Sequence, residues 1–362
     1  MAKTGIVTVN TSLNLRKAPG GAVIGSLKNG TPVTILDTTN GWHKVKAGQK
    51  TGFVSAKFVV IDHGSSKGFR TVGRTVLAPD GTAFARTFRK GVFNTGDTTI
   101  REFVSGSRTA FKNMAPSLLR VMEAVSANEG KLEAINTWDN AFLTFGVFQW
   151  TAGTGNGKGE LPSMLARLKD KAPDAYERLF GQFGLDVVDL QNPASGVPRG
   201  RFSLKGKVLR TAADKEKLRS LEWPYRFWLA GKDPAARQAE IEHATDRINV
   251  FYRNPGWMIR DRFIGDYVTS EYGVALLLDQ HVNRPGHVKS TVTKAVDKIA
   301  KELGSDDPKR WGFAEENRLI DLYLEFRAKT NMTDQAVRAR RTQDAVASGL
   351  ASDKRGSFKL PG

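Results

Sequence analysis

Residues 128–150 read NEGKLEAINTWDNAFLTFGVFQW, and within this stretch the pattern changes from helix to strand. Before it, apolar residues recur at helical spacing over residues 115–128, and Gly130 is placed to end that helix. After it, a segment rich in Thr, Trp and Phe turns at Asp139-Asn140, which predicts a β-hairpin. We therefore expect Glu129 where a helix ends against a hairpin, facing a cleft between helical and β parts.

Glu129 and Asp139 are candidate catalytic acids in unlike surroundings. Apolar neighbours such as Trp138 and Phe145 would raise the pKa of Glu129, and a carboxyl with a raised pKa can protonate a glycosidic oxygen near neutral pH. Asp139 lies on the turn, where better solvation would keep it ionised. Paired carboxyls in unlike environments carry out glycoside hydrolysis. Asp139 would stabilise the oxocarbenium-like state, act as nucleophile or position water; the alternative is a turn residue that caps its own backbone.

The same stretch resembles the lysozyme-like superfamily, closest in layout to phage-type lysozymes. In that superfamily the acid Glu ends a helix, a Gly follows, and a hairpin returns a Thr and a Gly across the cleft; here these are Glu129-Gly130, Thr144 and Gly146. The family more often has its Asp at the position that Trp138 occupies here. The resemblance implies a glycosidase that acts on peptidoglycan, with Glu129 as general acid and Thr144 as a further catalytic residue.

The resemblance leaves the reaction subtype open. Gln149 stands where a His is frequent in the phage-type enzymes, whereas goose-type enzymes and lytic transglycosylases often have Gly-x-x-Gln here. A lytic transglycosylase needs no second carboxylate, because the substrate supplies its own 6-hydroxyl. The function expected is therefore a peptidoglycan hydrolase of the endolysin kind, with a lytic transglycosylase or a non-catalytic wall-binding or structural phage protein as alternatives.

Five residues are expected to contact substrate, and three of them have a structural alternative. Trp138 and Phe145 would line the cleft, Gln149 would order either a sugar or only the hairpin, and Thr144 is equally readable as a plain strand residue. Gln280 and Asn283 lie at the end of a buried helix expected over residues 268–280, and their alternative role is to cap helix ends.

Residues 1–62 show a different pattern, with short apolar runs separated by Gly, Pro and Asn turns, which predicts a small β-barrel or sandwich. From Leu13-Asn14-Leu15-Arg16 through Gly41-Trp42 to Thr51-Gly52-Phe53-Val54 the region resembles a bacterial SH3 domain (SH3b). The resemblance implies a module that tethers an enzyme to peptidoglycan, with Arg16, Trp42 and Phe53 as wall-binding residues. Trp42 and Phe53 are equally readable as core aromatics.

The expected fold is multidomain: a small all-β SH3-like barrel followed by a mainly α (α+β) lysozyme-like domain with a β-hairpin at its active site. A linker is predicted at residues 63–75, the catalytic domain at 76–351, and a basic, frayed tail at 352–362. Residues 190–210, rich in Gly, Pro and Arg, are expected to be irregular.

Composition excludes several classes of function. The chain has 362 residues, a net charge of +18 and no cysteine, so thiol catalysis, disulfides and Cys-ligated zinc are excluded. Its five His residues show no metal-binding spacing, and we expect no metal or cofactor. The basic charge favours a polyanionic partner, expected to be the cell wall rather than nucleic acid, because no DNA-binding module is visible. We expect a monomer without a transmembrane segment or signal peptide, made in a host cytoplasm and released to the wall with a holin.

Overall fold

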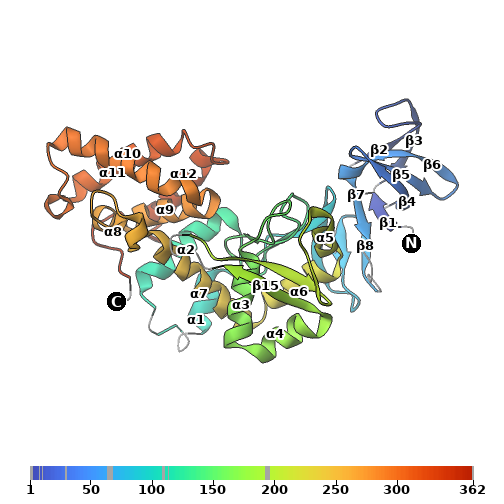
Figure 1. Cartoon of the computed structure of the whole chain (residues 1–362), viewed down its shortest axis with the longest axis horizontal. Coiled ribbons are helices and arrows are strands. Elements are labelled where there is room, and N and C mark those ends of the chain that lie inside the picture. Colours follow the sequence, from blue (N-terminus) through green and yellow to red (C-terminus); the bar gives the residue numbers. More distant parts are fainter. Residues whose placement is uncertain are drawn as a thin grey trace. The chain divides into compact units, whose positions relative to one another are not determined.

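The computed structural model describes residues 3–7, 9, 11–28, 31–62, 68–107, 111–112, 114–191 and 196–360. The chain forms two compact units. Figure 1 labels many of their helices and strands. The first unit comprises Met1–Asp97, Leu132–Leu190 and Arg199–Arg237, and the second comprises Thr98–Lys131, Gln191–Pro198 and Gln238–Gly362. The predicted catalytic region 76–351 is therefore divided between both units. No helix in the described part of the chain is long and apolar enough to cross a membrane.

The N-terminal region is all-β, as predicted. Its seven antiparallel strands have the order β3-β2-β6-β5-β4-β1-β7. They are β1 (Lys3–Val7), β2 (Ser12–Arg16), β3 (Val23–Lys28), β4 (Pro32–Thr39), β5 (Trp42–Ala47), β6 (Lys50–Ser55) and β7 (Val59–Asp62), with a short 3-10 helix η1 (Ala56–Phe58). Alternating side chains from these strands form a separate core, which includes Leu15, Val45 and Val54. The region therefore has its own hydrophobic interior.

A second antiparallel sheet in the first unit was only partly predicted. Its order is β14-β13-β12-β11-β10-β9-β8. The strands are β8 (Arg70–Val72), β9 (Thr75–Leu77), β10 (Ala83–Phe88), β11 (Gly91–Asn94), β12 (Ile135–Asn136), β13 (Thr144–Phe145) and β14 (Trp150–Thr151). The predicted hairpin corresponds to β12, β13 and β14. The predicted linker is corrected from residue 70 onward, where strand pairing begins; residues 63–67 lie outside the described residues.

In the rest of the first unit, Phe227 packs against three other aromatic rings. Its ring lies 5.3 Å from Phe145 of β13, 4.8 Å from Phe180 and 6.2 Å from Phe202, measured between centroids. The elements are α3 (Leu161–Lys171), α4 (Pro173–Leu179), η2 (Gly181–Phe183), β15 (Leu185–Gln191), β16 (Arg199–Leu204), β17 (Lys207–Val208), α5 (Ala212–Lys215), η3 (Glu216–Arg219) and α6 (Glu222–Ala230). Because β15, β16 and β17 form a three-stranded sheet, residues 190–191, 199–204 and 207–208 are not irregular as was expected.

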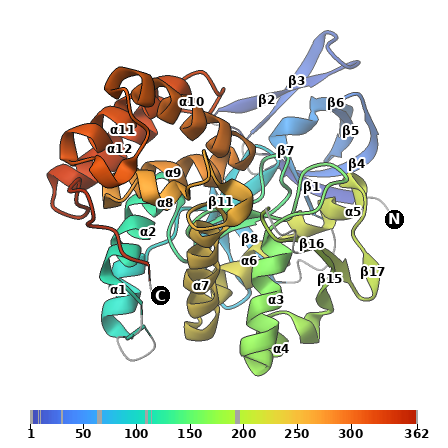
Figure 2. The ribbon, with the colours of Figure 1, turned by 60° about the vertical axis from the view of Figure 1, so that its left-hand side comes forward.

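The second unit is helical. Its elements are α1 (Ile100–Gly106), α2 (Pro116–Glu129), α7 (Pro234–Phe251), whose first residues are counted with the first unit, η4 (Pro255–Trp257), α8 (Ile264–Tyr267), α9 (Glu271–Asn283), α10 (Pro285–Leu303), η5 (Pro308–Arg310), α11 (Phe313–Arg327) and α12 (Gln335–Ala347). Helix α9 is buried along most of its length, as its apolar run predicted, and it packs against α2, α10 and α12 (Figure 2). A helix buried in this way places its few polar side chains in the interior.

Residues 352–360 correct the expectation of a frayed tail. Phe358 is buried and packs edge-to-face on Tyr252 at 5.1 Å. The Lys359 backbone N–H donates to Ser117 Oγ at 2.9 Å, and Arg355 Nη1 donates to Glu316 Oε2 at 2.5 Å. The physical reason is the aromatic side chain, which gains apolar burial that a purely polar tail would lack.

Candidate active site

Glu129 is the last residue of α2, as the sequence predicted. Gly130 follows in an extended conformation, and its N–H donates to Ser126 O at 3.0 Å. The Glu129 side chain is 14% exposed. The helix therefore delivers a largely buried carboxyl to its own C-terminal end.

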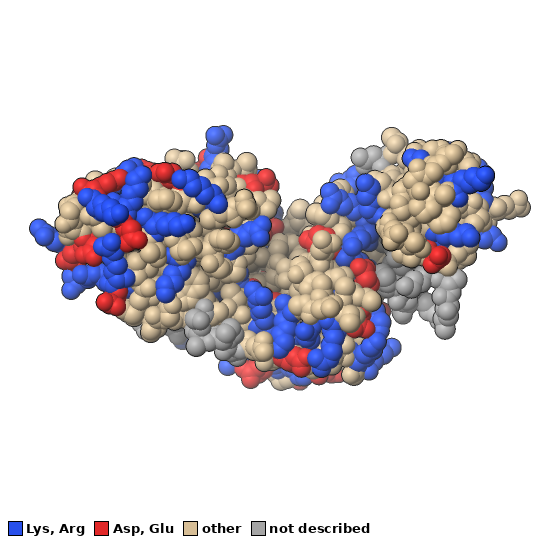
Figure 3. Space-filling view, turned by 45° about the horizontal axis from the view of Figure 1, so that its top comes forward, with Lys and Arg blue, Asp and Glu red and all other residues tan. Residues whose placement is uncertain are grey.

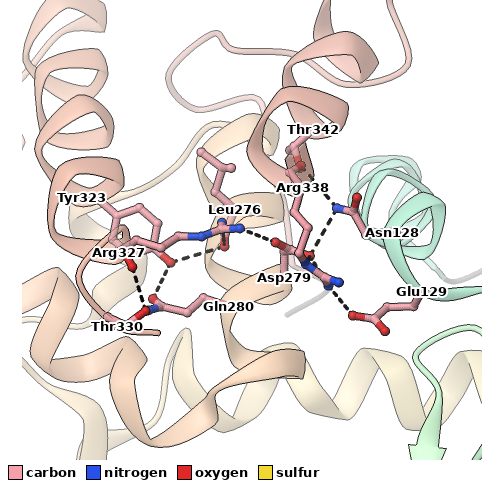
Figure 4. Close-up of polar contacts among 10 residues, drawn as sticks. All are labelled: Asn128, Glu129, Leu276, Asp279, Gln280, Tyr323, Arg327, Thr330, Arg338 and Thr342. Atoms are coloured by element: carbon pink, nitrogen blue, oxygen red, sulfur yellow. Dashed lines mark hydrogen bonds and ion pairs between the residues drawn. The ribbon is translucent and has the colours of Figure 1, made fainter. Parts of the chain in front are cut away.

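An ion network surrounds this carboxyl within the second unit (Figure 4). Arg338 of α12 donates through Nη2 to Glu129 and, at 2.6 Å, to Asp279 Oδ1 of α9. Arg327 of α11 donates to the other oxygen of Asp279 at 2.5 Å. Asn128 Nδ2 donates to Asp279 Oδ1 at 3.2 Å. Four helices thus meet at two carboxylates and two guanidinium groups.

Burial raises the pKa of Glu129 above its ordinary value. The Arg338 guanidinium acts in the opposite direction, because a nearby positive charge favours the ionised carboxylate. The Asp279 carboxylate adds to the rise, since two like charges at one site repel. This direction agrees with the requirement that a general acid hold its proton near neutral pH.

Several buried polar side chains of α9 have partners. Glu271 accepts from Arg120 of α2, with the shortest N–O distance at 2.5 Å. Gln280 Oε1 accepts from the Tyr323 hydroxyl at 2.6 Å. His281 Nδ1 accepts from Arg247 Nε at 2.9 Å. These pairings compensate the loss of solvation of groups that the buried helix carries into the interior.

Gln280 and Asn283 differ in how deeply they are buried. Gln280 is fully buried and bound by Tyr323 and Thr291, so it has no surface that would contact a sugar. Asn283 is the last residue of α9 and is half-buried. Its role as a substrate contact stays a prediction, whereas Gln280 is better described as part of the helix packing.

Asp139 lies in the loop between β12 and β13, in the first unit. Its Oδ1 accepts from the Ala141 N–H at 2.9 Å, and its Oδ2 accepts from Asn136 Nδ2 at 3.1 Å. Its carbonyl oxygen accepts from Arg219 Nη2 at 2.6 Å. Both carboxylate oxygens are thus engaged within the loop itself, which is the capping alternative raised by the sequence.

Thr144 and Gln149 contact each other across the hairpin. The Thr144 hydroxyl donates to Gln149 Oε1 at 2.7 Å, and Gln149 Nε2 donates to Gly146 O at 3.0 Å. Gln149 has a φ of 49°, in the left-handed region that is uncommon for a residue other than glycine. Of the two roles expected for Gln149, hairpin ordering is therefore observed.

Trp138 and Phe145 differ in accessibility. Phe145 is fully buried against Phe227, so its expected contact with a sugar is replaced by a core role. Trp138 is half-buried, packs edge-to-face on Phe88 at 5.1 Å, and has the Arg89 guanidinium carbon 4.6 Å from its ring centroid. Trp138 remains a candidate for ligand contact.

The expected wall-binding residues lie on the outward face of the N-terminal sheet. Arg16 of β2 pairs with Phe53 of β6, which pairs with Lys44 of β5, and Trp42 lies two residues from Lys44 on the same face. Arg16, Trp42 and Phe53 are half-buried and Lys44 is exposed. Three adjacent strands therefore present an aromatic and basic surface, which we call the β2-β6-β5 face. Trp42 and Phe53 therefore lie on this face and not in the hydrophobic core, which was the other role that the sequence allowed for them.

Residues 11–60 match the bacterial SH3 domain family. Domains of this family bind peptidoglycan, so the match associates the N-terminal region with the bacterial cell wall. Searches of curated proteins and of solved structures found no match for the chain. On the face shown in Figure 3, Lys and Arg side chains are dispersed among acidic and uncharged ones rather than gathered in one patch.

Sequence reasoning missed the roles of Arg338, Asp279 and Arg327. One signal was present: Asp279 directly follows the apolar run Val274–Leu278, and a carboxylate in a buried helix needs a cationic partner. No local pattern identifies Arg338 as that partner. Among the described residues, no group of three or more His, Asp or Glu side chains is placed to hold a metal ion.

Proposed function

We propose that the protein binds bacterial peptidoglycan through its N-terminal domain and cleaves glycosidic bonds of the glycan strand, with Glu129 as general acid. The observation that carries this proposal is the position of Glu129 at the end of α2, partly exposed and with a raised pKa. Such a carboxyl can hold a proton for the leaving oxygen at a pH where an exposed Glu would be ionised.

The contacts of Arg338 are compatible with this role. The guanidinium binds both Glu129 and Asp279, and Asp279 is fully buried. When Glu129 takes up a proton, Arg338 still has Asp279 as its counter-charge. Protonation therefore does not leave an isolated buried cation, which would be strongly unfavourable.

A lytic transglycosylase is the favoured subtype because of the hydrogen bonds that the Asp139 carboxylate makes. Both of its carboxylate oxygens accept hydrogen bonds within its own loop, which disfavours a role as nucleophile or base. In a transglycosylase the 6-hydroxyl of the substrate attacks in place of water, so one carboxyl serves first as acid and then as base. A hydrolase that uses Asp139 is the competing subtype.

Mass spectrometry of purified peptidoglycan after digestion tests the proposal. Anhydro-sugar ends support a transglycosylase, reducing ends support a hydrolase, and the absence of products supports a non-catalytic wall-binding protein. Glu129→Gln should lower the rate on the order of 10²-fold or more, because the amide has no proton to transfer. Glu123→Gln is the matched control, since Glu123 lies on the same helix and burial also raises its pKa. Equal activity of both variants would remove Glu129 from the mechanism.

A further inference from the structure

The hairpin turn between β10 and β11 carries an unusual arginine. Arg89 has a φ of 50°, in the left-handed region that favours glycine or asparagine. A bulky residue there costs free energy that glycine would avoid. The turn nevertheless places an exposed guanidinium beside two aromatic rings, with its carbon 5.2 Å from the Phe88 centroid and 4.6 Å from the Trp138 centroid.

Close backbone packing fixes this turn against the Trp138 loop. A Cβ on Gly91 would lie 2.5 Å from the Thr137 carbonyl group, so only glycine permits the approach. The Val92 N–H donates to Thr137 Oγ1 at 2.9 Å, and the Thr137 N–H donates to Val92 O at 2.9 Å. The two segments that carry Arg89 and Trp138 are therefore held together before any ligand binds.

The Trp138 loop is also fixed from its other side. The Trp138 N–H donates to Asn136 Oδ1 at 2.9 Å, and the buried Arg219 donates to the carbonyl of Asp139 at 2.6 Å. Trp138 itself is half-buried, so part of the indole remains accessible. A rigid aromatic surface of this kind loses little conformational entropy on binding.

The Arg89 guanidinium has no acidic partner among the residues that the structure describes. Its contacts are with ring faces, and no carboxylate lies within ion-pair distance of it. The neighbouring charges balance one another: Lys90 and Arg219 face the carboxylates of Glu216 and Asp139. The excess positive charge at this place is therefore that of Arg89 itself. A ligand that complements this arrangement would carry a carboxylate for the guanidinium next to a flat apolar surface for the rings.

We propose that Arg89 and Trp138 form a binding site for a hexosamine that bears a carboxylate. The carboxylate accepts hydrogen bonds from the guanidinium, and the sugar ring packs its C–H groups on the indole. This inference rests on the proposed function, which names peptidoglycan as the polymer that contains the sugar. A single-stranded nucleic acid is disfavoured, because a binding track needs successive aromatic rings along a basic groove, whereas the carboxylates of Glu216 and Asp139 adjoin this site.

Ligand-observed NMR on the full-length protein tests the site with two sugars. N-acetylmuramic acid and N-acetylglucosamine differ in the lactyl group that carries the carboxylate. We expect N-acetylmuramic acid to bind up to about fivefold more tightly, the scale of one exposed ion pair. It should also shift the Trp138 indole signal of ¹⁵N-tryptophan-labelled protein, identified by its absence in Trp138→Phe.

Substitutions test which residues produce the preference for N-acetylmuramic acid over N-acetylglucosamine. Arg89→Gln should abolish the difference between the two sugars, while Arg86→Gln, an exposed arginine on the same hairpin, should retain it. Trp138→Leu should weaken binding of both. Equal binding of both sugars to the unmodified protein would overturn the proposal, and so would an unchanged preference in Arg89→Gln. A Trp138 signal that shifts at a lower concentration of oligo(dT) than of N-acetylmuramic acid would also overturn it.

Failure of this site and failure of the catalytic proposal are distinguishable. Glu129→Gln should bind N-acetylmuramic acid normally, because Glu129 belongs to neither of the segments that form the site. Retained lytic activity in Glu129→Gln contradicts the catalytic role alone. Equal binding of the two sugars to the unmodified protein, with lytic activity still lost in Glu129→Gln, contradicts the Arg89 site alone.

Discussion

Arg338 binds the carboxylate of Glu129 across 209 residues of sequence. The same guanidinium donates to Asp279 at 2.6 Å. One arginine therefore joins the end of α2 to the buried face of α9. Its charge is the largest opposing influence on the pKa of Glu129, so the two residues should be linked in the pH dependence of activity.

Arg338→Met should move the alkaline limb of the kcat/KM profile to higher pH. The guanidinium lowers the pKa of Glu129, so its removal raises that pKa, and the protonated acid persists further into the neutral range. Arg341→Met, an exposed arginine on the same helix, is the control and should leave the limb in place. A limb that moves to lower pH in Arg338→Met would show that another group controls it.

Asp139→Asn should reduce activity by less than about tenfold, a smaller loss than removal of a catalytic acid or base produces. Asn retains an oxygen for the Ala141 N–H and loses only the acceptor for Asn136. The products should remain anhydro-muropeptides. A severe loss, together with reducing-end products from the unmodified protein, would instead identify Asp139 as nucleophile or base.

Asp279→Asn should destabilise the second unit by about 3–5 kcal/mol, because it leaves two buried guanidinium groups without their shared carboxylate. Arg327 and Asp279 are both fully buried. Hydrogen exchange of the α9 and α11 amides would report the loss. Asp321→Asn, at an exposed position on α11, should leave exchange nearly unchanged, and equal effects of the two changes would contradict the prediction.

Gly52→Ala should destabilise the N-terminal domain by about 1–3 kcal/mol, the usual cost of overpacking. A Cβ at Gly52 would lie 2.8 Å from the Arg16 carbonyl oxygen and from Leu15 Cγ, where β6 meets β2. Gly25→Ala is the control, since its Cβ would meet only Lys50 Nζ at 4.0 Å. Thermal unfolding followed by the N-terminal amide signals distinguishes them; a stable Gly52→Ala would mean that the strands separate readily.

Removal of residues 1–66 should weaken pelleting with purified peptidoglycan while cleavage of small soluble glycan fragments changes little. The region has its own core, so its loss need not disturb the other sheet. Lys44→Glu on the β2-β6-β5 face should also reduce pelleting, most strongly at low salt, because exposed charges are screened beyond about 8 Å at physiological ionic strength. Lys28→Glu, an exposed lysine of β3, makes the same charge change and should have less effect. Normal pelleting without residues 1–66 would place wall binding elsewhere.

Local patterns were predictable from sequence, and distant contacts were not. The end of α2 at Glu129 follows from helical spacing and Gly130, and the hairpin follows from its turn residues. The pairing of Glu129 with Arg338 depends on how four helices pack, for which no short-range signal exists. Strands β8 and β9 have three residues each, which is too short for a clear alternation of apolar and polar residues. The sequence therefore predicted only the hairpin part of the second sheet. Phe358 was overlooked because the basic residues around it dominate the composition of its segment.

The long sequence separation between Glu129 and Arg338 also has a consequence for biosynthesis. At typical translation rates of about 5–20 residues per second, the ribosome needs roughly 10–40 s to make the chain between them. Until α9 and α12 have been made, α2 lacks the charged partners Glu271 and Arg338 that these helices supply. The nascent chain therefore carries Glu129 as an ordinary solvated carboxyl, and the chemistry proposed for it begins only after α12 has emerged and docked.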